Sequence, residues 1–330
     1  MQVNESFYRG VKVLVTGGLG FIGSNLARRL VELGSDVSIV DSMLPNSGAN
    51  MANIQGLDGK LRVHVADLAD RAQIESLLPG HRIVFNLAGK SSHIDSMNDP
   101  LADLESNVQA HVTLLEAVRK LIPEARIVYS STRQIYGRPS YCPVDENHPV
   151  RPIDVNGVNK SAGESYHTLY HRVYGLDTVC LRLTNTFGPR MRIKDARQNF
   201  LGIWMRHVVE DTAFEVWGGL QKRDMTFIDD VVEAFLAAAA CPAPEHRVFN
   251  IGGSPAVSLV ELGNLLVGIA GAGRFEIRQF PKERLRIDLG DYSTNDALFR
   301  NATGWAPAVT LADGLARTVA FYRDRMSDYV

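Results

Sequence analysis

The sequence is poor in cysteine, carries almost no net charge and contains no long apolar run. Its three cysteines, Cys142, Cys180 and Cys241, are odd in number and lie far apart in the chain. This spacing fits neither a disulfide framework nor a cysteine-rich zinc site. We therefore expect three buried, inert thiols and no bound metal.

The near absence of net charge excludes several kinds of partner. Lysines plus arginines number 35 against 37 aspartates plus glutamates, which gives a formal net charge of −2. Such a chain has no field that attracts nucleic acid or anionic lipid, so an anionic ligand must be held by local contacts. No stretch approaches the roughly 18 apolar residues of a membrane span, and Met1–Gly10 is polar. We expect a cytoplasmic protein with no nucleic-acid partner and no membrane partner.

The first half of the chain alternates short β-branched runs with longer helical patterns. The runs predict strands at Val11–Val15, Val37–Val40, Leu61–Val65, Ile83–Asn86, Ile127–Tyr129 and Thr178–Leu181. This alternation predicts the α/β class, with a Rossmann-type doubly wound parallel sheet that is covered by helices on both faces.

Two long helices are expected in this half. Asn98-Asp99-Pro100 has the residues of a helix start, and apolar residues at helical spacing then predict a helix over Leu101–Leu121. A second helix is expected from about Gly157 to Tyr174, where Gly175 ends it.

The second half is less regular, because glycines and prolines separate its short elements. The helical stretch Val231–Ala240 and the short strand Val248–Ile251 are nevertheless expected to join the sheet. We predict a larger domain of residues 1–183 with about 225–251. Residues 184–224 and 252–330 are predicted to form a smaller, mixed α/β lobe.

A glycine-rich turn follows the first predicted strand. Gly17, Gly20 and Gly23 allow a tight turn, close approach of the backbone to a pyrophosphate and close packing of the following helix. Asp41 ends the second strand, where its carboxylate can accept hydrogen bonds from ribose hydroxyls and repel a 2′-phosphate. The pattern therefore predicts that the larger domain binds NAD rather than NADP.

With these motifs, the sequence resembles the extended short-chain dehydrogenase/reductase family of NAD-dependent nucleotide-sugar epimerases and dehydratases, and is similar to its UDP-glucose 4-epimerases. The resemblance covers nearly the whole chain. It is carried by Thr16–Gly23, Ala66-Asp67-Leu68, Asn86-Leu87-Ala88-Gly89, Asn107, Ser130-Ser131-Thr132, Tyr136-Gly137, Lys160, Asn185, Gly188-Pro189, Arg223-Asp224, Asp229, Phe249–Gly253 and Gly304-Trp305-Ala306-Pro307.

The resemblance implies a role for many positions. The residues expected to bind NAD are Gly17, Gly20, Phe21, Ile22, Gly23, Asp41, Ser42, Asp67, Leu68, Leu87, Ala88, Gly89 and Lys160. The residues expected to bind the nucleotide sugar through the smaller lobe are Asn185, Val216, Arg223 and Arg284. The two long helices are expected to pack against their copies in a four-helix bundle, which implies a homodimer.

The chain departs from the family at one catalytic position. Relatives use a Ser or Thr, a Tyr and a Lys that follows the Tyr by four residues; here Thr132 and Lys160 fill the first and last places, but Asn156 stands at the Tyr position. An amide cannot donate or accept a proton near pH 7. The possible substitutes are Tyr141, His93 and Lys90, with Lys160 itself as a further alternative, and the sequence does not choose between them.

The residues after Thr132 narrow the reaction that the resemblance implies. Dehydratase relatives have an Asp-Glu pair there and decarboxylase relatives a Glu, whereas this chain has Arg133 and Gln134. We therefore expect epimerisation at the C4 of a nucleotide-linked sugar, through a transient 4-keto intermediate. The alternatives are a keto-sugar-nucleotide reductase or dehydrogenase, and a catalytically impaired protein that still binds NAD and the sugar nucleotide.

Overall fold

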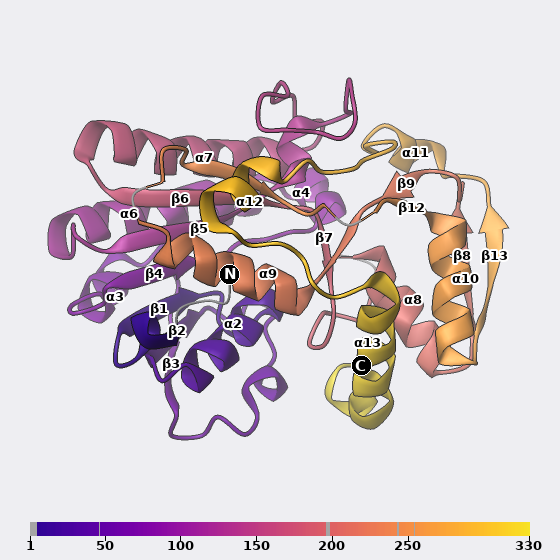
Figure 1. Ribbon diagram of the computed structural model, residues 1–330, viewed down its shortest axis with the longest axis horizontal. Helices are drawn as coiled ribbons and strands as arrows, with labels where there is room; N and C mark the ends of the chain where they lie inside the picture. The colour runs from indigo at the N-terminus through magenta and orange to yellow at the C-terminus, as the bar shows by residue number, and fades with distance from the viewer. Residues whose placement is uncertain (1–4, 46, 196–198, 243, 254) are drawn as a thin grey trace.

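The computed structural model describes residues 5–45, 47–195, 199–242, 244–253 and 255–330, apart from the side chains of residues 283 and 284. Seven parallel strands form the main sheet in the order β11-β6-β5-β4-β1-β2-β3. These strands are β1 (Lys12–Thr16), β2 (Asp36–Asp41), β3 (Leu61–Val65), β4 (Ile83–Asn86), β5 (Arg126–Thr132), β6 (Asp177–Leu183) and β11 (Val248–Ile251). The predicted doubly wound sheet is confirmed (Figure 1).

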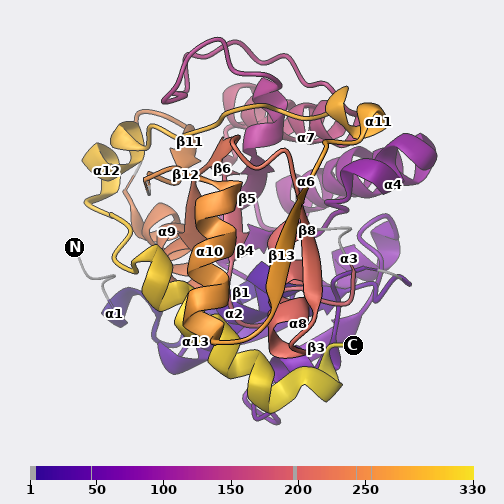
Figure 2. The same ribbon diagram turned by 90° about the vertical axis from the view of Figure 1, so that its right-hand side faces the viewer.

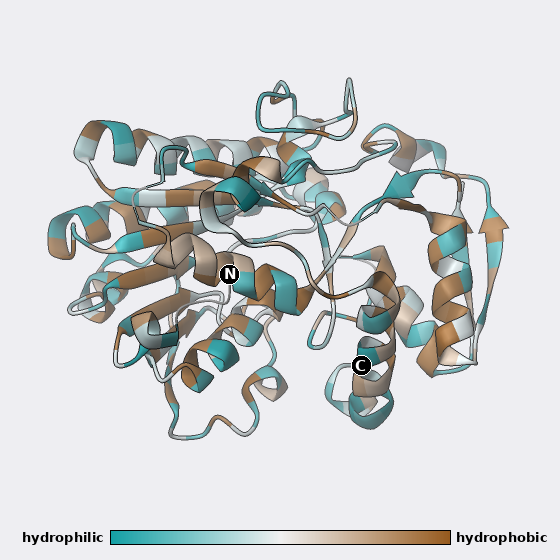
Figure 3. Ribbon diagram, in the orientation of Figure 1, coloured by the Kyte–Doolittle hydropathy of each residue, from teal (hydrophilic) through white to brown (hydrophobic). Residues whose placement is uncertain are grey.

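The central strands β1 and β4 are apolar on both faces because each face is covered by helices. Along β1, Val13 and Val15 point into one core, whereas Leu14 between them points into another. On β4, Phe85 lies in the first core and Val84 in the second. Figure 3 shows the resulting hydrophobic colour along the central strands.

Two sets of helices close these cores. Helices α2 (Phe21–Glu32) and α9 (Ile228–Ala240) contribute to the first core. Helices α3 (Arg71–Leu77), α6 (Ala110–Leu121) and α7 (Val155–Tyr174) contribute to the second. Short α1 (Glu5–Tyr8) is tied to α9 by the Tyr8 hydroxyl, which donates to the Leu236 carbonyl at 2.5 Å.

The helix expected over Leu101–Leu121 is longer and less regular than predicted. It consists of α5 (Pro100–Leu104), a π-helical turn over Glu105–Gln109 and α6, and α4 (His93–Asn98) precedes it. The side chain of Asp99 accepts a hydrogen bond from the Ala102 N–H, so the predicted cap is confirmed. The predicted end of α7 is also confirmed, because Gly175 adopts a left-handed conformation with φ 74°.

A second group of elements lies beside the sheet, on the right of Figure 1, and faces the viewer in Figure 2. Its strands pair as β8 (Ala213–Trp217) with β13 (Arg274–Arg278) and β9 (Lys222–Arg223) with β12 (Val257–Ser258). Its helices are α8 (Phe200–Val209), α10 (Leu259–Ala270), α11 (Lys282–Leu285) and α13 (Leu311–Arg325), while α12 (Ala297–Thr303) packs near β11. The proposed division of the chain into two domains stays a prediction.

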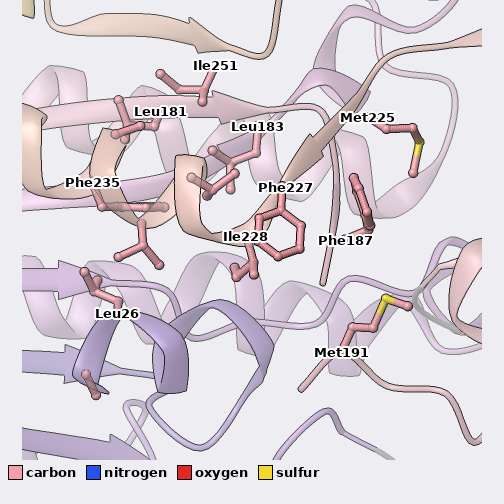
Figure 4. Close-up of a cluster of buried hydrophobic side chains, with 14 of the residues drawn as sticks. Leu26, Leu181, Leu183, Phe187, Met191, Met225, Phe227, Ile228, Phe235 and Ile251 are labelled. Atoms are coloured by element: carbon pink, nitrogen blue, oxygen red, sulfur yellow. The ribbon is translucent and has the colours of Figure 1, made fainter. Parts of the chain in front are cut away.

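One apolar cluster connects this group to the sheet. The short strands β7 (Asn185–Phe187) and β10 (Met225–Phe227) pair with each other and lie between the main sheet and the second group of elements. Figure 4 shows their apolar side chains packed among those of the sheet and its helices, with Leu26, Leu181, Leu183, Phe187, Met191, Met225, Phe227, Ile228, Phe235 and Ile251 labelled. The same continuous core therefore stabilises both groups of elements.

The three thiols are free, as expected, but they are not all buried. Cys180 on β6 is buried and Cys241 is partly buried, whereas Cys142 is exposed. The prediction was wrong for Cys142 because it lies in the loop between β5 and α7, where no second layer covers it. Within the described ranges, none of the helices has the length and apolar character that crossing a membrane requires.

Candidate functional site

A cavity of about 760 Å³ lies at the carboxyl ends of the sheet strands. Strand order reverses between β1 and β4, and ligands of open α/β sheets bind at such a point. All of the residues expected to bind NAD line this cavity, as do Thr132, Asn156, Lys90, His93, Asn185 and Arg223. We call the side around the Gly17–Gly23 turn and Asp41 the cofactor end, and the side around Thr132, Asn156 and Lys160 the reaction end.

The glycine turn is held by contacts that exclude a side chain. Gly17 has φ +65°, and a Cβ there would lie 2.9 Å from the backbone nitrogen of Ala88. A Cβ on Gly23 would lie 2.2 Å from the carbonyl oxygen of Gly17. Gly20 is the N-cap residue of α2 and supplies no side-chain cap, so the first N–H groups of α2 are free for an anion.

Asp41 closes the cofactor end. Its carboxylate accepts hydrogen bonds from the N–H groups of Leu19 and Met43, both at 3.0 Å. Burial raises the pKa of Asp41, and these two N–H groups oppose the shift. The carboxylate is thus fixed at the wall of the cavity, with lone pairs left for two ribose hydroxyls. The glycine cradle and this acceptor fit a dinucleotide such as NAD.

Lys160 and Thr132 lie together at the reaction end. Thr132 ends β5, and its hydroxyl oxygen accepts a hydrogen bond from the N–H of Gln134 at 3.3 Å. The ammonium of Lys160 donates to the carbonyl of Ser130 at 3.3 Å. Burial lowers the pKa of Lys160 from 10.5 to about 8, although the carboxylate of Asp103 opposes this shift. A buried amine with one protein acceptor has donors left for a ligand.

Asn156 does not leave an empty space in the wall. Its amide donates to the carbonyl of Lys90 at 2.8 Å and to Asp103 at 3.1 Å. Asn159 donates to the other oxygen of the same carboxylate at 2.8 Å. Asp103 therefore anchors Asn156, the residue at the position where the resemblance predicts a tyrosine.

Sequence reasoning missed Asp103, although it lines the cavity. The expected apolar stripe of this helix included Leu101 and Leu104, but these side chains are 75% and 44% exposed, whereas Asp103 is 1% exposed. The available signal was the presence of Asn156 and Asn159 one helical turn apart, because both amides need a buried acceptor.

The three candidate substitutes for the tyrosine occupy different environments. Tyr141 does not line the cavity; its hydroxyl donates to Asp145 at 2.8 Å at the surface. Lys90 lines the cavity, but its carbonyl is the part that receives the Asn156 amide. His93 lines the cavity and has a carboxylate partner, because its Nδ1 lies 2.8 Å from Asp154.

Asp154 is well placed to orient His93. Its side chain is 1% exposed, and its second oxygen caps α7 by accepting the N–H of Gly157 at 2.6 Å. The other ring nitrogen of His93 contacts the side-chain amide of Gln134. A histidine with Nδ1 fixed by a carboxylate can act as a general base through Nε2 once the Gln134 amide, which donates to that nitrogen, is displaced.

The four residues expected to bind substrate are placed unequally. Arg223 and Asn185 line the cavity. Arg223 is held by Asp288 at 2.9 Å and by the carbonyl of Gly290. Val216 is fully buried behind the wall, where the next residue, Trp217, lines the cavity instead. The side chain of Arg284 lies outside the described residues.

Arg133 also lines this cavity, next to Thr132, and sequence reasoning used it only to exclude other reactions. Its Nη2 donates to the side-chain oxygen of Asn185 at 3.0 Å, and its guanidinium lies 4.9 Å from the ring of Tyr292. Burial lowers the pKa of Arg133. The reaction end therefore contains a buried guanidinium. The resemblance had indicated only that the carboxylates of a dehydratase are lacking at this position.

Comparisons with known proteins agree with this geometry. The chain is 33% identical to a UDP-glucose 4-epimerase of Mycolicibacterium smegmatis over 96% of this chain and 99% of the relative. The structure matches a UDP-glucose 4-epimerase of Thermotoga maritima solved with UDP-glucose, with a TM-score of 0.87, 27% identity and coverage of 96% and 100% of the two chains. A dTDP-glucose 4,6-dehydratase of Streptomyces venezuelae with NAD bound matches with a TM-score of 0.85, 28% identity and coverage of 96% and 98%.

A family model also matches most of the chain. The model of the NAD dependent epimerase/dehydratase family covers residues 13–252, which include the glycine turn, Thr132, Asn156, Lys160 and Arg223. The fold, the cavity and the sequence comparisons thus give the same answer, and the chain belongs to the NAD-dependent epimerase/dehydratase family.

Proposed function

We propose that this protein holds NAD at the cofactor end and interconverts two nucleotide-linked sugars that differ in configuration at C4. The observation that carries this proposal is one continuous cavity, which joins the dinucleotide cradle to Thr132 and Lys160 and then to Arg223. Its relatives in Mycolicibacterium smegmatis and Thermotoga maritima are named UDP-glucose 4-epimerases, which supports a UDP-sugar as the substrate.

The chain's own residues position the reactants. The α2 N-terminus and the glycine turn hold the pyrophosphate, Asp41 holds the adenosine ribose, and Lys160 holds the nicotinamide ribose. Bound NAD supplies reversible acceptance of a hydride from the sugar carbon. Thr132 orients the reacting hydroxyl, and Arg223 binds the diphosphate through its planar guanidinium. Return of this hydride to the opposite face of the sugar would invert C4 and would need no added reductant.

We assign the proton transfer to His93. When the sugar hydroxyl displaces the Gln134 amide from Nε2 of His93 and the sugar is oxidised, this nitrogen takes the hydroxyl proton, and the carboxylate of Asp154 stabilises the imidazolium that forms. The same nitrogen returns the proton when the keto group is reduced. Among the three candidate substitutes, His93 alone combines a place in the cavity wall with a carboxylate partner.

Dehydration is disfavoured by the residues that follow Thr132. A dehydratase needs a carboxylic acid to protonate the leaving hydroxyl, but Arg133 and Gln134 occupy these places. Neither side chain can supply that proton near neutral pH. The cavity therefore favours exchange of a hydride and a proton at one carbon.

The function can be tested on the purified protein. Denaturation followed by mass analysis should release NAD, and incubation with a panel of UDP-sugars that includes UDP-glucose and UDP-glucuronate should convert at least one of them to its C4 epimer with no net change in NADH absorbance. Stoichiometric consumption of added NADH or NAD would instead favour a keto-sugar reductase or dehydrogenase. Binding without turnover over a panel of UDP- and dTDP-sugars would favour the impaired homologue.

We further propose a homodimer in which α5–α6 and α7 pack against their copies. Apolar side chains are exposed along these helices: Leu101, Leu104, Leu121, Val158, Tyr166, Leu169, Val173 and Tyr174. Such a face fits a symmetric interface. Val173→Glu should convert a dimer to a monomer in analytical ultracentrifugation, whereas Leu220→Glu, at a side chain that is 83% exposed outside these helices, should not. A monomeric unmodified protein would overturn this proposal.

We propose a cytoplasmic location because the cysteines form no disulfide among the described residues. Cys142, Cys180 and Cys241 are all free. Free thiols are typical of proteins in reducing compartments. Fractionation of cells that contain the protein would test the location.

A further inference from the structure

Arg133 is a buried cation at the wall of the reaction end. It directly follows Thr132, and the whole residue is 7% exposed. One of its nitrogens, Nη2, is bonded to Asn185, while the plane of the guanidinium lies near the ring of Tyr292. These contacts fix the orientation of the side chain but supply no negative charge.

The second terminal nitrogen of Arg133 lacks a partner. Among the described residues, Nη1 has no hydrogen-bond acceptor and the guanidinium has no ion pair. The nearby buried acid Asp224 has its carboxylate oxygens engaged by Thr184 and by the N–H of Thr294. Leaving a buried charged donor unpaired is costly, so such groups in folded proteins usually have a function or a ligand.

Other buried arginines of the chain each have a carboxylate partner within the protein. Arg182 forms three hydrogen bonds to Glu164, at 2.6, 3.0 and 3.2 Å, and a fourth to the Tyr136 hydroxyl. Arg223 has Asp288. Arg133 differs from both because no carboxylate of the described protein meets it, and it lines the cavity in which substrate is proposed to bind.

We infer that Arg133 receives a carboxylate on the sugar ring, so that the substrate is a nucleotide-linked uronic acid. This inference rests on the proposed function and names the substrate class of the same site. Arg133 and Thr132 line the same cavity, and Thr132 is proposed to orient the reacting carbinol, so the guanidinium is assigned to the sugar, whereas Arg223 is assigned to the diphosphate. A carboxylate matches the planar fork of a guanidinium and balances its charge; a neutral hydroxymethyl group does neither.

The test compares three ligands on the NAD-loaded protein by titration calorimetry: UDP, UDP-glucose and UDP-glucuronate. We expect UDP-glucuronate to bind about 10- to 100-fold more tightly than UDP-glucose, the range for a hydrogen bond to a charged group. Arg133→Gln should remove this preference and leave the affinity for UDP unchanged. Arg133→Lys, which keeps the charge but loses the fork, should recover part of the preference.

A matched variant separates the sugar from the diphosphate. Arg223→Gln should weaken all three ligands to a similar degree, and thermal unfolding with NAD checks that each variant is folded. If Arg133→Gln weakens UDP as much as UDP-glucuronate, Arg133 binds the diphosphate and the inference is overturned. It is also overturned if the unmodified protein binds UDP-glucose as tightly as UDP-glucuronate.

The failure of the proposed function has a different signature. In that case the unmodified protein binds neither UDP nor the corresponding dTDP ligands, although NAD is held. The inference then falls together with the function. Binding of UDP with no preference among the sugars leaves the proposed function standing and removes only the uronic acid.

Discussion

The two ends of the cavity are built by different means. At the cofactor end, backbone groups define the shape: the N–H groups of α2, the close contact between Gly17 and Gly23, and the N–H groups that hold Asp41. At the reaction end, side chains define the chemistry, and two of them depend on partners far away in the sequence. Asn156 meets Asp103, and His93 meets Asp154.

This difference explains why relatives can share one cofactor and catalyse different reactions. A backbone cradle tolerates few substitutions, because any added side chain meets backbone atoms. A cluster of side chains can be exchanged as a set while the strands beneath it remain in place. In this chain the set includes Asn156, Asp103 and Arg133, which all line the cavity, so the reaction end can change while the glycine turn stays in place.

The largest effect is expected from a substitution that disturbs only the reaction end and lowers turnover. His93→Gln should lower the turnover of the nucleotide sugar by about 100- to 10,000-fold, the usual contribution of a general acid–base group. The affinity for NAD should stay the same, because the cofactor end is untouched. Tyr141→Phe is the matched control and should keep wild-type turnover, because that phenol lies outside the cavity. Wild-type turnover in His93→Gln would move the role to Lys160.

The second prediction concerns the buried charge of Lys160 in the absence of NAD. Its pKa is lowered from 10.5 to about 8 in the folded protein, so between these values the unfolded chain binds more protons than the folded one. The contribution of Lys160 to the free energy of unfolding should therefore rise with pH across this window, by about 3 kcal/mol. Urea unfolding at several pH values checks this.

Lys160→Met is the control for that series. It removes the titrating group but keeps an unbranched apolar side chain, so the rise between pH 8 and 10.5 should be smaller than in the unmodified protein by the contribution of Lys160. Parallel pH profiles of the two proteins would show that Lys160 is not an unfavourably buried cation. The same variant should also lose affinity for NAD, since Lys160 is proposed to hold the nicotinamide ribose.

The sequence was sufficient for the sheet and for the conformation of the glycine turn. Strand periodicity and glycine spacing are local signals, and they predicted β1 to β6, β11 and the glycine turn. The reaction end was only partly accessible, because its contacts join residues that are far apart in the sequence. The partner of Asn156 could not be derived from the segment around it, and Val216 was chosen where Trp217 lines the cavity.

Whether a given side chain is buried or exposed was equally difficult to derive from the sequence. Leu101 and Leu104 fit a helical apolar stripe, yet both are exposed and Asp103 between them is buried. The π-helical turn over Glu105–Gln109 follows these residues, and a regular helical period cannot be carried through such a turn. The exposure of Cys142 was not predicted either, because an isolated cysteine in a loop has no periodic pattern that indicates whether it is buried.

The third prediction moves to the cofactor end. Asp41→Ala should weaken NAD binding by roughly 1.5–3 kcal/mol, the range for a hydrogen bond to a charged group, while NADP binding is spared. The variant removes both a ribose acceptor and the repulsion of a 2′-phosphate. Titration of the two cofactors into both proteins measures the change. Equal affinity of the unmodified protein for NAD and NADP would contradict this role of Asp41.

The last prediction tests whether backbone contact defines the cofactor end. Gly23→Ala places a Cβ 2.2 Å from the carbonyl oxygen of Gly17, so the turn must open, and the free energy of unfolding should fall by about 1–3 kcal/mol. Gly268→Ala is the matched control on α10, where nothing lies within 4 Å of the added Cβ. It should be neutral or stabilising by up to about 1 kcal/mol, because alanine favours a helix. Equal effects of the two substitutions in urea unfolding would show that helix propensity, rather than close backbone packing, governs the glycine turn.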